Sequence, residues 1–272
     1  MKLSPTSFRR LVVADDLGAS PGVNRAIAQA YSEGGLTHSS IMVNAPYFRQ
    51  AMEEVVRPRP HLNIGLHLNL TTGTPSAGLA AVPSLVGPDG CFRHGFFSLW
   101  KATTGRDRKD LIEQIGEEIS AQILQAQAQG LRLTHLDGHR HVHLIPLVYE
   151  AVKELAARHG IPRVRIINES LAHTLQTTRA AACLFHPNLL KYFLLKRLCR
   201  VQQPGGEAYF FSILFSCRLT PRLVARAQPP PGWKTMEVMV HPGDPEIDRV
   251  LSWDDPIYRA HLVSPFRTLE LK

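Results

Sequence analysis

Short apolar runs alternate with helical stretches over most of the chain, and this alternation restricts the fold more than any other feature of the sequence. The first run, at residues 9–15, is β-branched and ends on a polar residue, as a buried strand does. A helical stretch follows at residues 20–35, where Ser20 suits the N-cap and Pro21 the first turn. Further strands are predicted at residues 37–44, 61–70, 131–137, 162–167 and 234–243, and further helices at residues 47–56, 106–130 and 145–160. Strands that alternate with helices imply a parallel sheet, wound open or closed into a barrel.

Two ranges depart from this alternation. Residues 71–95 are rich in glycine and proline and are predicted to form a long loop at a binding mouth. Residues from about 173 to 220 are apolar and basic by turns. We therefore predict an α/β, barrel-like fold in one domain over residues 1–272, with the range 173–220 inserted as a helical cap region.

Composition narrows the class of protein. The 272 residues are 44% hydrophobic, which is ample for a large core. The net charge of +8 is spread along the chain without a recognised nucleic-acid motif, so we expect no nucleic-acid partner. The four cysteines lack CxxC spacing and fit a reducing compartment. Residues 1–8 carry no apolar secretory segment and no run of about 18 apolar residues occurs, so a cytoplasmic location without a spanning helix is predicted.

The first predicted strand ends on two adjacent acids, Asp15 and Asp16. In parallel α/β folds the carboxyl ends of the strands open onto the active-site face. Adjacent side chains there point in different directions, so that one carboxylate can hold a cation while the other takes a proton. An N-cap role before the following helix is the alternative for this pair.

Histidines gather after the strand predicted at residues 131–137. The stretch THLDGHRHVH, residues 134–143, holds four of the thirteen histidines of the chain. We expect the strand to stop near Asp137 and Gly138, where glycine lets the chain turn, so that His139 is the first imidazole at the strand end. His67, in GLHLNL, lies near the end of another strand. A solvated, histidine-rich loop is the alternative.

One aspartate and two histidines from three strand ends make a metal site with open positions for water and substrate. Imidazole and carboxylate ligands suit zinc, and also manganese, iron, cobalt or nickel. His241, in EVMVHPG, follows the last strand where Pro242 and Gly243 force a turn. It can serve there as a general acid to a leaving amine, or as a packing histidine.

Four segments together resemble the YdjC/ChbG-like carbohydrate deacetylases. They are ADDLG with SPGVN, GLHLNL, THLDGHRHVHLIP and EVMVHPG, in this order from Ala14 to Gly243. Each motif alone is weak, but four in order over most of the chain are a strong signal. The resemblance implies a distorted (β/α), TIM-like barrel that hydrolyses an N-acetyl group on an amino sugar with a divalent metal ion, magnesium or zinc.

The resemblance also assigns roles to residues. Asp16, His67 and His139 match the metal ligands of the family. Asp15 matches the position of the catalytic base, and His241 that of a catalytic acid.

One further match and two departures concern the substrate pocket. Arg165, in RVRII, matches a rim position where the family often has an arginine, which would bind substrate or orient a catalytic carboxylate. Leu17 replaces the usual phenylalanine of ADDFG, a hydrophobic exchange that should spare the metal. Ser212 and Cys217 lie in SILFSCRL, a segment where relatives often carry glycines, and this bears on the shape of the pocket.

The resemblance extends to two branches of the family, and so two acetylated substrates stay open. VNAPYF and SPGVNRAI look similar to the hopanoid biosynthesis-associated (HpnK) branch, which implies a glycolipid substrate and peripheral contact with the inner membrane surface. Residues 183–201 add a basic, amphipathic pattern that suits an anionic membrane, although a cap helix packed on the barrel would look the same. The other branch acts on soluble chito-oligosaccharides. A homodimer is the oligomeric state that we expect.

Two other classes of function are left open by the residues. A metal-dependent isomerase or phosphoesterase would need a second metal ion or more carboxylates than the strand ends offer. A non-enzymatic metal- or nucleic-acid-binding module would show salt-dependent retention on nucleic acid. Release of acetate and a free amine separates a deacetylase from both.

Overall fold

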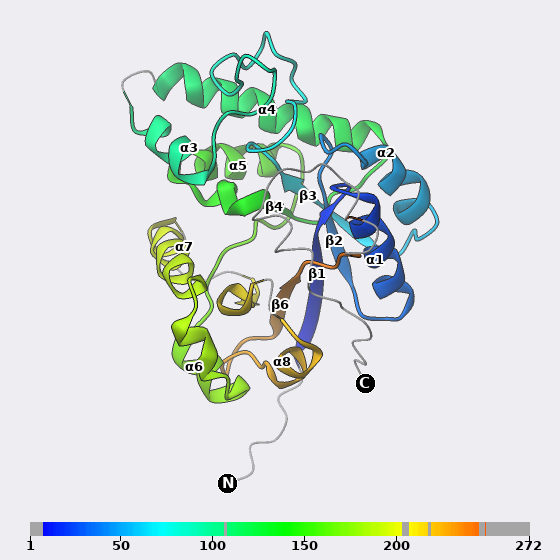
Figure 1. The fold of residues 1–272 in the computed structure, drawn as a ribbon, viewed down its shortest axis with the longest axis vertical. Coiled ribbons are helices and arrows are strands. Elements are labelled where there is room, and N and C mark those ends of the chain that lie inside the picture. Colours follow the sequence, from blue (N-terminus) through cyan, green and yellow to red (C-terminus); the bar gives the residue numbers. More distant parts are fainter. Residues whose placement is uncertain (1–7, 106–107, 203–206, 217–218, 245–247, 249–272) are drawn as a thin grey trace.

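Six parallel strands form the centre of the molecule. The structure, a computed structural model, describes residues 8–105, 108–202, 207–216, 219–244 and 248. The strands are β1 (Arg9–Leu17), β2 (His38–Ile41), β3 (Asn63–Leu68), β4 (Leu136–Gly138), β5 (Tyr209–Phe211) and β6 (Thr235–Val240). They run in the order β4-β3-β2-β1-β6-β5, and every pair of neighbours is parallel. The sheet curls into a half-barrel, so the predicted α/β fold of a distorted, TIM-like barrel is confirmed (Figure 1).

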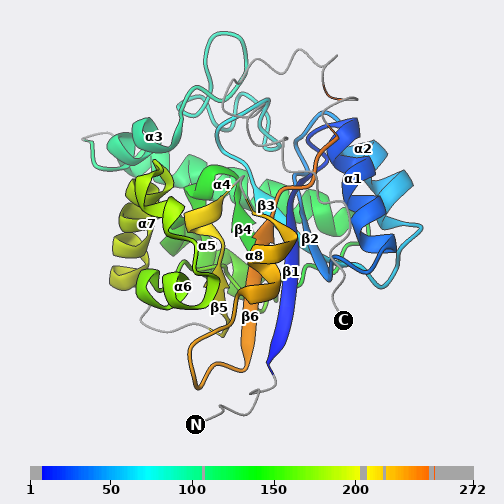
Figure 2. The same ribbon diagram turned by 60° about the horizontal axis from the view of Figure 1, so that its bottom comes forward.

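Helices surround this sheet on the outside (Figure 2). They are α1 (Pro21–Ser32), α2 (Phe48–Gln50), α3 (Phe96–Thr103), α4 (Arg108–Ala128), α5 (Pro146–Arg158), α6 (Leu171–Thr178), α7 (Asn188–Gln202) and α8 (Pro221–Arg226). A π-helical turn, Ala51–Val56, continues α2, and 3-10 turns occupy His139–Leu144, Ala181–Phe185 and Ile213–Phe215. Within the described part of the chain, no helix combines the length and hydropathy that crossing a membrane requires.

The sequence pattern predicts β1 and α1 closely because local signals define both. From Leu11 to Leu17 every residue of β1 is buried. The Ser20 side chain accepts a hydrogen bond from the backbone N–H of Val23 at 3.0 Å, and Pro21 opens α1. Ser20, rather than Asp15 or Asp16, is therefore the N-cap of this helix.

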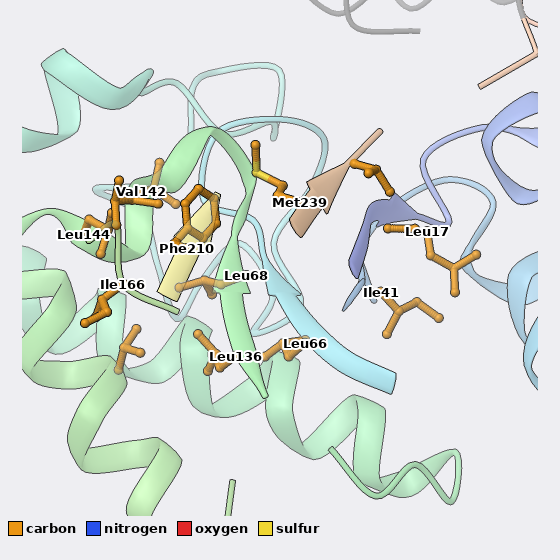
Figure 3. Packing of buried hydrophobic residues seen from close by; sticks show 14 of the residues in the cluster. Leu17, Ile41, Leu66, Leu68, Leu136, Val142, Leu144, Ile166, Phe210 and Met239 are labelled. Atoms are coloured by element: carbon orange, nitrogen blue, oxygen red, sulfur yellow. The ribbon is translucent and has the colours of Figure 1, made fainter. Parts of the chain in front are cut away.

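The core lies between the sheet and its helices. Leu66 of β3, Leu136 of β4 and Met239 of β6 belong to one continuous cluster of buried side chains (Figure 3). Phe210 of β5 joins the same cluster. A core of this kind fixes the strands relative to one another, and with them the side chains at the strand ends.

The strand predicted at residues 162–167 does not form as a full strand. The backbone around Val164 makes a single bridge to Leu136 of β4. The side-chain amide of Asn168 then takes the place of a backbone pairing to β5, because it donates to the Ala208 carbonyl at 2.9 Å and accepts from the Phe210 N–H at 2.7 Å. Residues 163–168 thus fill the gap between β4 and β5 with one bridge and one amide.

Other elements differ from the sequence predictions. The strand expected at residues 131–137 begins only at Leu136. Three helices, α3, α6 and α8, are not predicted by the pattern, and β5 lies within the range 173–220 that the sequence assigns to a cap. The division of the chain into barrel and cap stays a prediction.

Candidate active site

Polar side chains from four strand ends gather at one edge of the sheet. Asp15 and Asp16 lie at the end of β1, His67 on β3, His139 directly after β4 and His241 directly after β6. Because the strands are parallel, their carboxyl ends meet on the same side. All five side chains line a pocket of about 660 Å³, which α3 and α7 enclose from the other side.

Asp16, His67 and His139 form a compact cluster of metal-binding side chains. Oδ1 of Asp16 lies 3.0 Å from Nε2 of His67 and 2.8 Å from Nδ1 of His139. One ligand atom from each residue lies within 4.8 Å of the others. Burial would raise the pKa of Asp16, but the charges and hydrogen bonds of the two histidines hold it well below its usual range. Two imidazoles and one carboxylate at this separation fit a divalent transition metal ion.

The backbone at Asp16 separates the two adjacent aspartates. Asp16 adopts a left-handed conformation with φ 67°, and the pairing of β1 with β2 shifts register between Ala14 and Leu17. A non-glycine residue in this region costs about 1–3 kcal/mol and persists only where its surroundings enforce it. The irregularity directs Asp16 at the histidines, while Asp15 meets a different partner.

A second carboxylate holds His67 in place. Oδ1 of Asp137 lies 2.6 Å from Nδ1 of His67. Burial would lower the pKa of His67, but the charges of Asp137 and Asp15 and the hydrogen bonds to Asp137 and Asp16 raise it to about 10. The site therefore favours a positive charge at this imidazole. A carboxylate behind a histidine is also the arrangement that orients metal-ligating histidines in proteins.

Arg165 is fully buried and joins three carboxylates. Its Nη1 and Nη2 donate to the two oxygens of Asp15 at 2.6 and 2.8 Å, and Nη2 also lies 2.6 Å from Oδ2 of Asp137. Its Nε donates to Oε1 of Glu237 at 2.5 Å. Burial would lower the pKa of Arg165, but the charges of Asp137 and Asp15 raise it. Arg165 does not line the pocket, so of its two expected roles the geometry favours orientation of a carboxylate.

A second group of possible metal ligands differs from the group of Asp16, His67 and His139 because its carboxylates are paired with Arg165. Ligand atoms of Asp15, His67 and Asp137 also lie within 4.8 Å of one another. Both of its carboxylates are already paired with the Arg165 guanidinium. The positive charge that a metal ion would bring is supplied there by the protein, so Asp16, His67 and His139 are the better metal site.

His241 lies next to Asp15 in the pocket lining. Its Nε2 lies 4.0 Å from Oδ2 of Asp15, and its side chain is only 16% exposed. Burial lowers the pKa of His241, although the charges of Asp15 and Asp16 oppose this. The imidazole and the Asp15 carboxylate line the same pocket side by side.

The turn after β4 differs from the expectation. The strand ends at Gly138 as predicted, but Gly138 is extended with φ −160° and makes no turn. The chain turns instead at Arg140 and His141, which are left-handed with φ 54° and 58°. Gly138 is required for space, because a Cβ there would lie 2.8 Å from Nδ1 of His143.

Sequence reasoning did not assign roles to three charged residues of the site. Asp137 and Glu237 are buried acids on strands, and Arg163 forms an ion pair with Glu237. The signal that could have found Glu237 is its position within the apolar run TMEVMV, because a carboxylate inside a buried strand must be paired.

Known sequences of one protein family match most of this chain. The model of the YdjC-like protein family matches residues 10–262. A carbohydrate deacetylase from Brevibacillus brevis is 39% identical over 155 residues, 57% of this chain and 58% of that protein. A carbohydrate deacetylase from Geobacillus stearothermophilus is 38% identical over 168 residues, 61% of this chain and 63% of that protein. The chain thus spans about six tenths of the length of these two relatives.

A longer match and a solved structure extend the comparison. A chitooligosaccharide deacetylase from Serratia marcescens is 33% identical over 206 residues, 73% of this chain and 78% of that protein. The crystal structure of a proposed cellobiose-phosphate cleavage protein from Enterococcus faecalis has the same fold, with a TM-score of 0.63 and 21% identity over 96% of this chain and 98% of that one. On the family match and the Serratia relative, this chain belongs to the YdjC-like protein family.

Proposed function

We propose that the protein is a metal-dependent hydrolase that removes the N-acetyl group from an N-acetylated amino sugar. The observation that carries this proposal is the position of Asp15. It is oriented by Arg165 and lies beside the cluster of Asp16, His67 and His139 at the floor of one pocket. The names of the matching relatives, carbohydrate deacetylase and chitooligosaccharide deacetylase, support the same chemistry.

Asp16, His67 and His139 would hold the ion, with Asp137 orienting His67. A divalent ion bound there lowers the pKa of water and polarises a carbonyl oxygen. The donor set suits zinc and related transition metals better than magnesium, which prefers oxygen ligands.

Asp15 is the proposed general base. Its carboxylate borders the pocket and is gripped at both oxygens by Arg165, so its direction is fixed. It takes the proton of the attacking water as the water adds to the acetamide carbonyl.

His241 is the proposed general acid. It lies across the pocket edge from Asp15 at 4.0 Å and delivers a proton to the sugar nitrogen as the C–N bond breaks. Acetate and the free amine leave.

The outer wall of the pocket favours a substrate with an apolar part. Phe96 and Phe97 of α3 and Leu190 and Leu194 of α7 line it. A sugar ring can stack its C–H face on one of the phenylalanines, and the rest of the apolar wall would bind the aglycone of a lipid that carries an amino sugar. We therefore propose a lipid-linked amino sugar, such as a glycosylated hopanoid, as the substrate. The relationship to the Serratia enzyme favours a soluble chito-oligosaccharide as the second candidate.

Exposed apolar side chains near the pocket suit a peripheral membrane contact. Phe97 is 68% exposed, Leu190 76% and Phe185 92%, and the first two line the pocket. Lys191 lies beside Leu190 on α7. Apolar side chains next to basic ones are typical of proteins that lie on anionic lipid surfaces.

Acetate release tests the proposal directly. The zinc-loaded protein is assayed with diacetylchitobiose and with an N-acetylglucosaminyl-hopanoid in detergent, beside Asp15→Asn with its metal content measured. We expect acetate from the lipid substrate, and a loss of at least about a hundredfold in Asp15→Asn at unchanged metal content. Turnover of the soluble sugar alone would replace the substrate assignment. Acetate release from neither substrate above the Asp15→Asn level would contradict the proposed function.

The membrane contact has its own measurement. Co-sedimentation with vesicles of an anionic and of a zwitterionic lipid is compared for the wild type and for Phe185→Ser with Leu190→Ser. We expect binding to the anionic vesicles that the double substitution removes. Equal binding by both proteins would exclude this surface.

A further inference from the structure

His141 is the histidine of the stretch 134–143 that the proposed chemistry leaves without a role. The other three have partners among the described residues. His135 contacts the Thr134 hydroxyl at 3.0 Å, His139 contacts Asp16, and Nε2 of His143 lies 3.1 Å from the Arg165 carbonyl. No hydrogen bond of the described residues involves the imidazole of His141, and its Nδ1 is enclosed without a partner. His135 and His143 also have one buried nitrogen each without a hydrogen-bond partner, so what sets His141 apart is that no hydrogen bond of the described residues involves either of its ring nitrogens.

The position of His141 connects it with the pocket. The residue is only 4% exposed, yet it belongs to the pocket lining together with Arg140. Both residues adopt the left-handed conformation, which costs a non-glycine residue about 1–3 kcal/mol. This backbone turns the two side chains toward the pocket after β4 ends.

His141 is not part of the metal clusters. Among the described residues, neither group of ligand atoms within 4.8 Å contains it. It is not tied into the core by a hydrogen bond either, unlike His143 two residues later. What remains is a nearly enclosed imidazole in which Nδ1 is buried, so Nε2 is the nitrogen open to whatever fills the pocket.

The pocket has few polar groups of this kind outside the proposed chemistry. Its outer wall carries mainly aromatic and aliphatic side chains of α3 and α7, with Asn188 and Lys191 of α7 among them. Asn188, also in the lining, already donates its side-chain amide to the Ser216 carbonyl at 3.0 Å. A sugar held against apolar side chains still needs polar groups to fix its orientation.

We propose that His141 is a substrate-binding residue whose pocket-facing imidazole nitrogen hydrogen-bonds a hydroxyl group of the amino sugar. The hydrogen bond fixes the sugar ring relative to Asp15 and the metal ligands. The inference takes its substrate class from the proposed function and adds to it a specificity-determining contact.

Two substitutions distinguish the effect of losing the proposed hydrogen bond from the effect of changing the left-handed backbone. His141→Asn tolerates the left-handed backbone well, but its amide lies near the position of Nδ1 and is too short to reach the position of Nε2. His141→Gln carries its amide near the position of Nε2 and can restore the contact. His61→Asn, at an exposed histidine, is the matched control.

The experiment measures KM and kcat for acetate release from whichever of the two candidate substrates the wild type turns over, calorimetric binding of the same substrate, and metal content. We expect His141→Asn to raise KM and the dissociation constant about tenfold with kcat within about threefold of the wild type. His141→Gln and His61→Asn should both stay within about threefold of the wild type.

Three outcomes would overturn the inference. They are unchanged KM and substrate affinity in His141→Asn, loss of bound metal in that variant, and no binding of either candidate substrate by the wild type. Binding of a substrate by the wild type without acetate release from either one would overturn the proposed function instead. Calorimetry on the same variants would then still decide the role of His141.

Discussion

Gly65 shows how closely the chain packs beneath the site. A Cβ on this residue of β3 would lie 2.4 Å from the ring of His135, which is fully buried and has no room to move. We predict that Gly65→Ala lowers the free energy of unfolding by about 1–3 kcal/mol. Gly116→Ala in α4 is the matched control, because a Cβ there meets nothing within 4 Å and should stabilise the helix by about 0.5–1 kcal/mol. Urea denaturation measures both, and changes of the same sign would contradict the prediction.

Ser212 occupies a backbone conformation that suits glycine. Its φ is 124° and ψ −2°, and its hydroxyl donates to the Met239 carbonyl at 2.8 Å. Glycine and alanine substitutions both remove this hydrogen bond, but only glycine relieves the backbone. We predict that Ser212→Gly is more stable than Ser212→Ala by about 1 kcal/mol or more. Equal thermal unfolding of the two variants would show that residue 212 carries no backbone strain.

Buried Glu169 joins several elements to one another. Its carboxylate accepts hydrogen bonds from the Ile213 N–H at 2.8 Å and from the Thr174 hydroxyl of α6 at 3.1 Å. Burial raises the pKa of Glu169 to about 7, although these hydrogen bonds oppose the shift. The folded protein therefore binds this proton more tightly than the unfolded chain does, and its stability falls as pH rises through about 7.

Glu169→Gln should remove this dependence on pH. We predict that the free energy of unfolding of the wild type falls by about 3 kcal/mol more than that of Glu169→Gln between pH 5 and pH 8. Urea denaturation at the two pH values, with both proteins in the same buffers, gives the difference. Parallel pH profiles would mean that Glu169 is ionised throughout this range.

The elements predicted well are those that local signals define. The β-branched run of β1 and the capped start of α1 carry their own structural information, and so do the turns that leave His67 and His241 at strand ends. The three residues of β5 do not, because they pair with β6 and with the amide of Asn168 from distant parts of the chain. The same holds for the partners of Arg165, since no spacing in the sequence indicates which buried acid meets which arginine.

Metal binding is a property of the whole molecule, because the three proposed ligands come from β1, β3 and the turn after β4. These segments meet only in the folded chain. An ion that binds the folded state alone stabilises it by about 2.7 kcal/mol at a concentration 100 times its Kd. We predict that zinc raises the Tm by several degrees, that a chelator reverses the rise, and that Asp16→Asn abolishes it. Scanning calorimetry measures this, and a rise that persists in Asp16→Asn would place the ion elsewhere.

The barrel is closed between β4 and β5 by residues 163–168, largely through side chains. Asn168 reaches β5, while Arg165 crosses the interior to Asp15 on β1 and Glu237 on β6. The Arg165 guanidinium, which orients the proposed base Asp15, therefore also holds the barrel wall together. A substitution that widened this wall for a bulkier sugar would also turn the carboxylate of Asp15. Substrate range and reactivity are therefore expected to change together during the divergence of this chain, rather than one at a time.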